Sequence, residues 1–172
     1  MNTKPIRGFT LHELLIAMAI ISILALSIGA LGEAIAKQRL QTTHGELAKL
    51  ITMARWHAMS TTSRVTLCPL QDNVRCQLPW SGTLTSFLDN NGNRMLDPGE
   101  EVIAHISLPN RAALDWRGMS PTHSLHFSGN GMTFVSNGTF TLCHRGIHET
   151  RRLILNKQGR LKSERLYSTC PH

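Results

Sequence analysis

The chain of 172 residues has room for one small domain and one anchoring segment. It carries a formal net charge of +7, and residues 111–172 hold seven Arg and two Lys against three acidic residues. This C-terminal excess fits either an acidic or polyanionic partner or a merely solvated basic surface. We expect no enzyme, because the sequence contains no Gly-x-Ser-x-Gly elbow, no phosphate-binding loop and no paired carboxylates in an apolar setting.

An uncharged apolar run begins close to the N-terminus. The run Leu14–Leu31 would cover roughly 27 Å as a helix, close to the hydrocarbon thickness of a bilayer. Lys4, Arg7 and the junction Gly8-Phe9 precede the run, whereas a secretory signal places its cleavage site after the apolar core. Glu13 is a lone carboxylate at the start of the run, where charge is costly and usually has a task.

The residues Gly8-Phe9-Thr10-Leu11-His12-Glu13-Leu14-Leu15, followed by a spanning run, resemble the class III signal of type IV pilins and pseudopilins. The resemblance implies that a prepilin peptidase cuts after Gly8 and that Phe9 is then N-methylated. It also implies that Glu13 neutralises the Phe9 amine of a neighbouring subunit in a filament. His12 departs from the family pattern, which has an apolar residue there. A plain single-pass anchor is the alternative.

The helical pattern continues beyond the apolar run. Apolar residues recur at helical spacing at Leu40, Leu47, Ile51, Ala54 and Ala58, and no proline interrupts residues 9–60. One helix is therefore predicted over residues 9–60. Its first part, 9–32, would lie in the membrane or the filament core, and 33–60 would be amphipathic. Residues 1–8 would form a leader peptide and residues 61–172 a globular β domain.

Beyond the helix, apolar residues recur at every second position in short runs, and turn sequences separate these runs. This predicts an antiparallel β domain, so the fold class is α+β. Strands are expected at Val65–Leu67 (ended by Pro69), Thr83–Leu88, Val102–Ser107, Ala113–Trp116, Ser124–Phe127, Met132–Val135, Thr139–Cys143, Arg152–Leu155 and Arg160–Leu166. Tight turns are expected at Ser128–Gly131, Asn137-Gly138 and Asn156–Gly159, and a loop at Cys68–Trp80.

Four cysteines follow the apolar run, and an even count in an exported domain favours two disulfides. Three pairings are possible. We favour Cys68–Cys76 and Cys143–Cys170, because each closes a local loop. A zinc site is the rival interpretation, but no Cys-x-x-Cys and no paired His spacing supports it, so we predict no metal and no cofactor.

The stretch Asp89–Glu100 places oxygen-bearing residues at the spacing of a calcium loop. Arg94, however, occupies the position where the EF-hand turn requires Gly, and no helical pattern flanks the stretch. We therefore favour a connection between strands in which Asp and Asn side chains bond their own backbone.

Five pieces resemble the FimT/FimU minor pilins and the related type II secretion pseudopilin GspH, and they occur in the family's order. They are Val65–Pro69, Phe87–Asn93, Asp97–Glu100, Gly138–Cys143 and Arg151–Arg160. The resemblance implies the type IV pilin fold, in which a long N-terminal helix packs on two small β-sheets. It also implies a role in a type IV pilus or a pilus-like machine.

The candidate binding site is a basic group near the C-terminus. It comprises Arg151, Arg152, Lys157, Gly159, Arg160, Lys162 and Arg165. Arg offers a planar donor fork and Lys a point charge, and both suit phosphates. The run Gly159–Lys162 resembles the Gly-Arg-x-Arg motif with which FimT-type pilins of naturally competent bacteria contribute to DNA capture, although Lys replaces the second Arg. No aromatic ladder accompanies it, which favours backbone contacts to duplex DNA over stacking on single strands.

The sequence thus predicts a minor pilin that binds double-stranded DNA without sequence preference, for uptake in natural transformation. Its other partners would be major and minor pilins, prepilin peptidase and the inner membrane. It would be a single-pass inner-membrane protein with a periplasmic C-terminal domain, and would later be extracellular in the filament. The alternatives are a structural or priming minor pilin that binds no DNA and a type II secretion pseudopilin.

Overall fold

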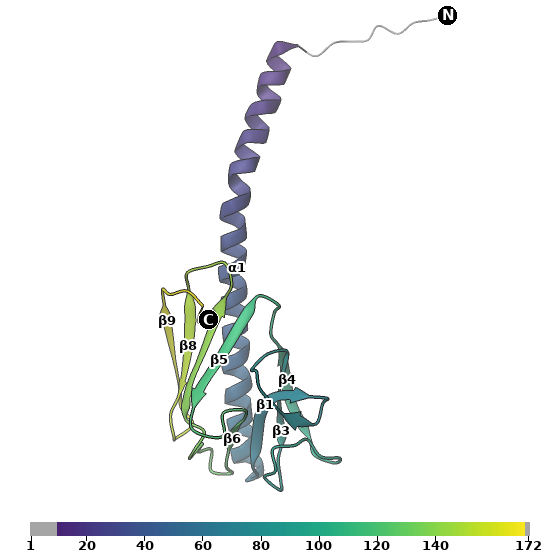
Figure 1. Ribbon diagram of the computed structural model, residues 1–172, viewed down its shortest axis with the longest axis vertical. Coiled ribbons are helices and arrows are strands. Elements are labelled where there is room, and N and C mark those ends of the chain that lie inside the picture. Colours follow the sequence, from purple (N-terminus) through teal and green to yellow (C-terminus); the bar gives the residue numbers. More distant parts are fainter. Residues whose placement is uncertain (1–9, 171–172) are drawn as a thin grey trace, which may run out of the picture. The chain divides into compact units, whose positions relative to one another are not determined.

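The computed structural model describes residues 10–170, and at residues 24 and 26–30 it describes the backbone alone. Its contacts divide the chain into two compact units, Met1–Ile35 and Ala36–His172. Helix α1, Leu11–Thr61, contributes to both units, and nine β-strands follow it in the described part of the second (Figure 1). The predicted α+β class is confirmed. Residue 9, where the helix was expected to begin, lies outside the described residues.

Within the first unit, the start of α1 lies in the described part of the chain, whereas Gly8 and Phe9 lie outside it. Among the residues that the structure describes, no helix combines the length and apolarity that a membrane crossing requires. The expected span Leu14–Leu31 includes the residues of which only the backbone is described.

In the second unit, α1 buries one face against the β domain. The predicted apolar positions Leu40, Leu47, Ile51, Ala54 and Ala58 are all at most 2 % exposed. Their spacing of three, four and seven residues puts them on one stripe of a 3.6-residue helix. The opposite side carries exposed residues, so this part of α1 is amphipathic as the sequence predicts.

Two antiparallel sheets pack on this stripe. The first has the order β2-β1-β3-β4, with β6 also paired to β1, and the second has the order β5-β7-β8-β9. The strands are β1 Val65–Gln71, β2 Arg75–Cys76, β3 Thr83–Leu88, β4 Val102–Ser107, β5 Ala112–Gly118, β6 Leu125–Phe127, β7 Gly138–His144, β8 Thr150–Leu155 and β9 Leu161–Leu166. Trp116 and Phe140 from the second sheet and Trp80 from the loop before β3 meet in the shared core, with ring centroids 4.2–6.2 Å apart.

Two strand predictions were wrong. Strand β1 does not end at Pro69 but continues to Gln71, and the expected loop Cys68–Trp80 contains the short strand β2. On one edge of β1, the pairing with β6 extends only to Leu67, and the pairing with β2 begins at Leu70. Pro69 therefore lies where that edge needs no N–H donor.

The second error is at Met132–Val135, which forms no strand. The backbone of Phe134 adopts a positive φ of 40°, which a strand cannot accommodate. Thr133 instead donates its N–H to the Lys157 carbonyl at 3.0 Å, so this loop bonds the β8–β9 turn rather than a strand.

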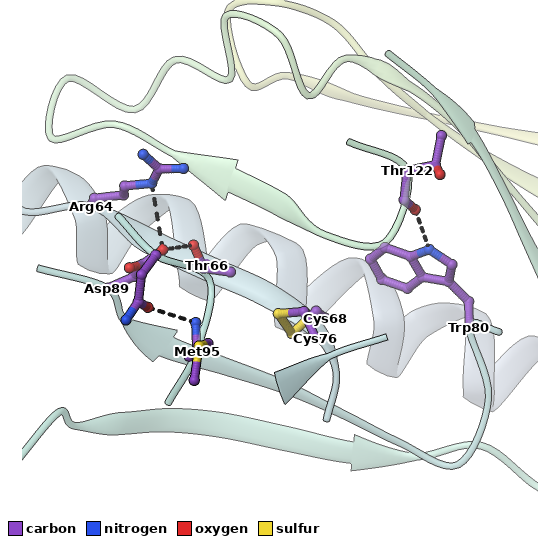
Figure 2. The surroundings of a disulfide bond; sticks show 9 residues. Arg64, Thr66, Cys68, Cys76, Trp80, Asp89, Met95 and Thr122 are labelled. Carbon is purple, nitrogen blue, oxygen red and sulfur yellow. Dashed lines mark hydrogen bonds and ion pairs between the residues drawn. A yellow bond between two sulfur atoms is a disulfide. The ribbon is translucent and has the colours of Figure 1, made fainter. Parts of the chain in front are cut away.

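A buried polar group closes the end of the first sheet. The Asp89 carboxylate is fully buried, accepts a hydrogen bond from the Thr66 hydroxyl and lies 3.6 Å from Arg64 Nε (Figure 2). The Cys68–Cys76 disulfide ties β1 to β2 in the same region. A buried carboxylate is costly unless it is ion-paired and hydrogen-bonded. For Asp89, Arg64 supplies the ion pair and Thr66 the hydrogen bond.

His126 in β6 is buried in the same region, and its Nδ1 lies 2.9 Å from the Ser136 hydroxyl. Burial, reinforced by the positive charges of Arg64 and Arg94, lowers the pKa of His126 to about 4, although Asp89 opposes the shift. The ring is therefore neutral in the folded protein at neutral pH.

The free energy of unfolding should therefore fall as the pH drops from about 6.5 towards 4, because the unfolded chain protonates His126 at a higher pH than the folded chain does. The loss due to His126 is at most about 3 kcal/mol. Urea unfolding at several pH values checks this, with His126→Gln as the comparison. The variant should be less stable at pH 7.5 but should show a flatter pH dependence across that window. Parallel curves for the two proteins would contradict the assignment.

Candidate nucleic-acid interface

The expected basic group lies on the hairpin β8–β9. Its turn, residues 156–159, is closed by a bond from Gly159 N–H to the Asn156 carbonyl at 2.9 Å and by one from Arg160 N–H to the Asn156 side-chain oxygen at 2.9 Å. The expected turn Asn156–Gly159 is therefore present. Pairing in register follows, from Leu155 opposite Leu161 to Thr150 opposite Leu166.

The alternation of side chains along the hairpin divides the basic residues between two faces. Leu153 and Leu155 point to the core, and Arg151 shares their side of β8. Arg152 points the other way and lies opposite Glu164. On β9, Arg165 is opposite Arg151, whereas Lys162 shares the outer face with Arg152. The sequence-predicted group is thus not one cluster.

The inner pair of arginines shares one buried carboxylate. Glu149, 2 % exposed, lies 3.1 Å from Arg151 Nη2 and 2.6 Å from Arg165 Nη2. Arg165 also covers the Tyr167 ring, with its guanidinium carbon 5.1 Å from the ring centroid. The carboxylate offsets one of the two positive charges, so the inner pair keeps one, and the Arg165 side chain is 48 % exposed.

On the outer face, Lys162 and Glu164 form an exposed ion pair at 2.8 Å. The Glu164 carboxylate accepts a hydrogen bond from Lys162 and raises the pKa of Lys162, and the same bond lowers the pKa of Glu164. The Lys162 side chain is still 74 % exposed, so a phosphate can compete for it.

Three cations of the predicted group carry free charge. Arg152, Lys157 and Arg160 are exposed, and within the described residues 10–170 none of their side chains makes an ion pair. Lys157 and Arg160 belong to the turn, and Arg152 lies on the outer face of β8. These three, together with the shared charges of Lys162 and Arg165, are what the hairpin offers to an anion.

The turn is held in place by a residue that the sequence analysis missed. Arg55 of α1 donates from Nε to the Gly131 carbonyl at 3.0 Å, and the turn packs over both groups. Gly159 is buried with φ +74°, and a Cβ there would lie 2.3 Å from the Gly131 oxygen and 2.6 Å from Arg55 Nε. No local pattern marks Arg55, because its hydrogen-bond partner Gly131 lies 76 residues downstream and Gly159 lies still further along the chain.

The C-terminal tail is tied to the same sheet. A disulfide joins Cys143 of β7 to Cys170, and a bond of 2.8 Å joins the hydroxyls of Thr150 and Ser168. The two disulfides in the structure are the pairings that the sequence favoured, and the described residues contain no free cysteine.

The Asp89–Glu100 loop satisfies its own polar groups. Asn91 and Asn93 accept bonds from backbone N–H groups two residues ahead at 3.0 and 2.8 Å, and their amides donate to the Asp97 carboxylate. Arg94 adopts φ +61° where the EF-hand has its Gly. In the described part of the chain, no group of three or more His, Cys, Asp or Glu side chains has a geometry suited to a metal ion.

At the other end of the chain, Glu13 caps its own helix. Its carboxylate accepts bonds from the Thr10 N–H at 2.9 Å and the Thr10 hydroxyl at 3.0 Å, and the Thr10 hydroxyl accepts from Glu13 N–H at 3.3 Å. This reciprocal arrangement is a capping box, which satisfies two otherwise unpaired donors at the start of α1. The Glu13 side chain is exposed.

Two protein-family models match the chain. The model described as "Type II transport protein GspH" matches residues 45–159, and the model described as "Prokaryotic N-terminal methylation motif" matches residues 3–29. No curated protein matches the sequence.

Two crystal structures of the type IV minor pilin FimU from Pseudomonas aeruginosa strain PAO1 are similar in fold. In the P21 crystal form the TM-score is 0.52 at 22 % identity, over 74 % of this chain and 90 % of that chain. In the P65 form the TM-score is 0.51 at 20 % identity, over 72 % and 91 %. At these identities the likeness shows the fold.

The packing at Gly159 makes a measurable prediction. Gly159→Ala should lower the free energy of unfolding by about 3 kcal/mol, because a positive φ costs a side chain about 1–2 kcal/mol and the added Cβ must also displace Gly131 or Arg55. Gly82→Ala is the matched control, since Gly82 has φ +70° but nothing within 4 Å of a Cβ, and it should cost only about 1 kcal/mol. Denaturant unfolding measures both, and equal losses would show that the turn is not tightly docked.

Proposed function

The chain belongs to the family of the type II transport protein GspH and carries the prokaryotic N-terminal methylation motif, and from that premise we propose that this FimT/FimU/GspH-like minor pilin binds extracellular double-stranded DNA for uptake in natural transformation. The observation that carries the proposal is the docked turn of β8–β9, where Lys157 and Arg160 are exposed and unpaired among the described residues. The family is one of structural pilins rather than of enzymes.

The chemistry of this turn supports contact with phosphates. Arg160 can form two parallel bonds to one phosphate, and Lys157 adds a point charge on the same turn. Arg152 and Lys162 extend the positive charge along the outer face of the hairpin. Neutralising several phosphates releases counterions, which gives sequence-independent binding that depends steeply on salt.

The aromatic side chains support duplex rather than single-stranded DNA. Stacking on single strands needs exposed rings that follow one another along a groove. Among the described residues around the hairpin, the exposed rings are Tyr167, Phe134 and Trp56. They belong to three separate segments (the C-terminal tail, the loop after β6 and α1) rather than to one strand, and Arg165 covers one face of Tyr167. The ligand would therefore be held through its backbone.

In this proposal the N-terminal unit brings the basic turn to the filament. Prepilin peptidase would cut after Gly8, Phe9 would be N-methylated, and residues 9–32 would hold the subunit in the inner membrane with its C-terminal domain in the periplasm. The subunit would then join other major and minor pilins, which would place the turn outside the cell. Retraction of the filament by other components would draw in bound DNA.

The DNA proposal predicts that Lys157→Gln together with Arg160→Gln weakens binding of the full chain to a labelled duplex. The slope of log affinity against log salt should decrease by about 2, because two phosphate contacts are lost. Fluorescence anisotropy over a salt series measures both quantities.

The matched control is Arg111→Gln together with Arg145→Gln, which removes the same charge. These residues are exposed and adjacent, since Arg145 N–H bonds the Arg111 carbonyl at 2.9 Å, and they lie beyond the opposite end of β8. The control should bind nearly as well as the parent. If both double variants weaken binding equally, net charge rather than the turn holds DNA.

Two other functions remain candidates, each favoured by one observation. The match to the GspH model favours a secretion pseudopilin whose partners are pseudopilins and exoproteins. The likeness to FimU favours a priming or tip-complex minor pilin that binds no DNA. Absence of duplex binding at low salt would favour these two, and co-purification with other minor pilins or with pseudopilins would separate them.

The role of Glu13 in assembly can be tested separately from its role in the capping box. Glu13→Ala should leave cleavage after Gly8 possible but impair N-methylation or incorporation into filaments. Thr10→Ala removes the capping hydroxyl while keeping the acid, and should cost only about 1 kcal/mol of helix stability. Mass spectrometry of the N-terminus and immunoblots of sheared filaments measure the outcomes. If both variants are incorporated normally, the acid has no role in assembly.

A further inference from the structure

A polar hollow of about 500 Å³ lies on the outer face of the sheet β5-β7-β8-β9, beside the C-terminal tail. Its lining includes Arg117 of β5, Thr139 and Thr141 of β7, Arg152 of β8, and Ser168 and Thr169 of the tail. Of these residues only Arg152 belongs to the basic group expected from the sequence. Two guanidinium groups and several hydroxyls therefore converge on a water-accessible space.

The strand register explains this convergence. Arg117 is paired with Thr139, and Arg152 is paired with Thr141, so the two threonines lie side by side between the arginines. Strands β5 and β8 flank β7 and are about 10 Å apart. Arginine side chains are long enough to reach towards a common ligand from both sides of that gap.

The tail supplies a wall of the hollow. The Cys143–Cys170 disulfide and the bond between the Thr150 and Ser168 hydroxyls hold residues 168–170 against the outer face. The Ser168 hydroxyl is therefore held beside the hollow, which lowers the ordering cost of binding a ligand there.

The charges of the hollow favour an anion. Arg152 makes no ion pair within residues 10–170. Arg117 donates from Nε to the Asp115 carboxylate at 2.9 Å, which leaves its terminal nitrogens for a ligand. Asp115 is the one acid in the lining, so the arginines outnumber it.

We propose that this hollow is a phosphate subsite of the DNA interface, so that the duplex crosses the outer face of the sheet from the β8–β9 turn to β5. Two guanidinium forks and flanking hydroxyl donors match the oxygens of a phosphodiester. The hollow shares its face with Lys162, and Arg160 lies about 14 Å along β9 from the position opposite Arg152. The subsite rests on the proposed DNA-binding function.

The test measures binding of a labelled duplex to the full chain by anisotropy over a salt series. Arg117→Gln together with Arg152→Gln should lower the affinity about tenfold at low salt and reduce the salt slope by about 1, because both side chains hold the same phosphate. Thr139→Val together with Thr141→Val keeps the charge and the side-chain shape, and should weaken binding several-fold without changing the slope. Asp115→Asn should strengthen binding, because it removes the opposing charge and frees Arg117.

The double variant Arg111→Gln with Arg145→Gln is again the control. It removes the same charge as Arg117→Gln with Arg152→Gln, but away from the outer face of the sheet. If Arg117→Gln with Arg152→Gln binds as this control does while Lys157→Gln with Arg160→Gln still weakens binding, the subsite is refuted and the DNA function stands. If the parent chain fails to bind duplex at low salt, the subsite and the DNA-binding function are both refuted. Unchanged thermal unfolding of the variants shows that altered binding is not due to misfolding.

Discussion

The sheet β5-β7-β8-β9 must bury one face against α1, and this requirement decides which cations can meet a ligand. Side chains alternate along a strand, so the inward positions of Leu153 and Leu155 send Arg152 outward. The same register places Arg151 and Arg165 on the inner face, where Glu149 offsets one of their two charges. The free charge of the hairpin is therefore smaller than its composition indicates, and it is concentrated on one face and one turn.

Rigidity of the turn matters as much as its charge. Ordering a flexible loop on binding costs free energy that reduces affinity. Here the turn is already ordered, because Thr133 bonds the Lys157 carbonyl and Gly159 packs on Arg55 and Gly131. A positive φ and a close backbone approach explain why Gly occupies position 159, independently of any contact that it makes to DNA.

The sequence predicted the elements well, because their signals are local. The helix, the strands Thr83–Leu88 and Val102–Ser107 and the Asn156–Gly159 turn all follow from period and turn chemistry. The prediction that the first strand ends at Pro69 was wrong, because the pairing on that edge of β1 depends on strands distant in sequence. Asp115 and Arg117 flank the buried Trp116, and Thr139 and Thr141 flank the buried Phe140, so the sequence indicates that these four side chains point outward. The pairing of β5 with β7, which brings the four together, cannot be predicted from either strand alone.

The salt dependence sets how firmly such a face can hold DNA. With Arg117 and Arg152 on one phosphate and Lys157, Arg160 and Lys162 on one each, the salt slope would be at most about −3.6, so raising salt from about 50 to 200 mM would weaken binding roughly 150-fold. Asp115 and Glu164 lie on the same face and are paired with two of these cations, which lowers the effective number. The β domain of one subunit would thus hold a duplex loosely at physiological salt. Firm capture would then require the β domains of several subunits on one filament, because linked sites bind with an avidity that a single site lacks.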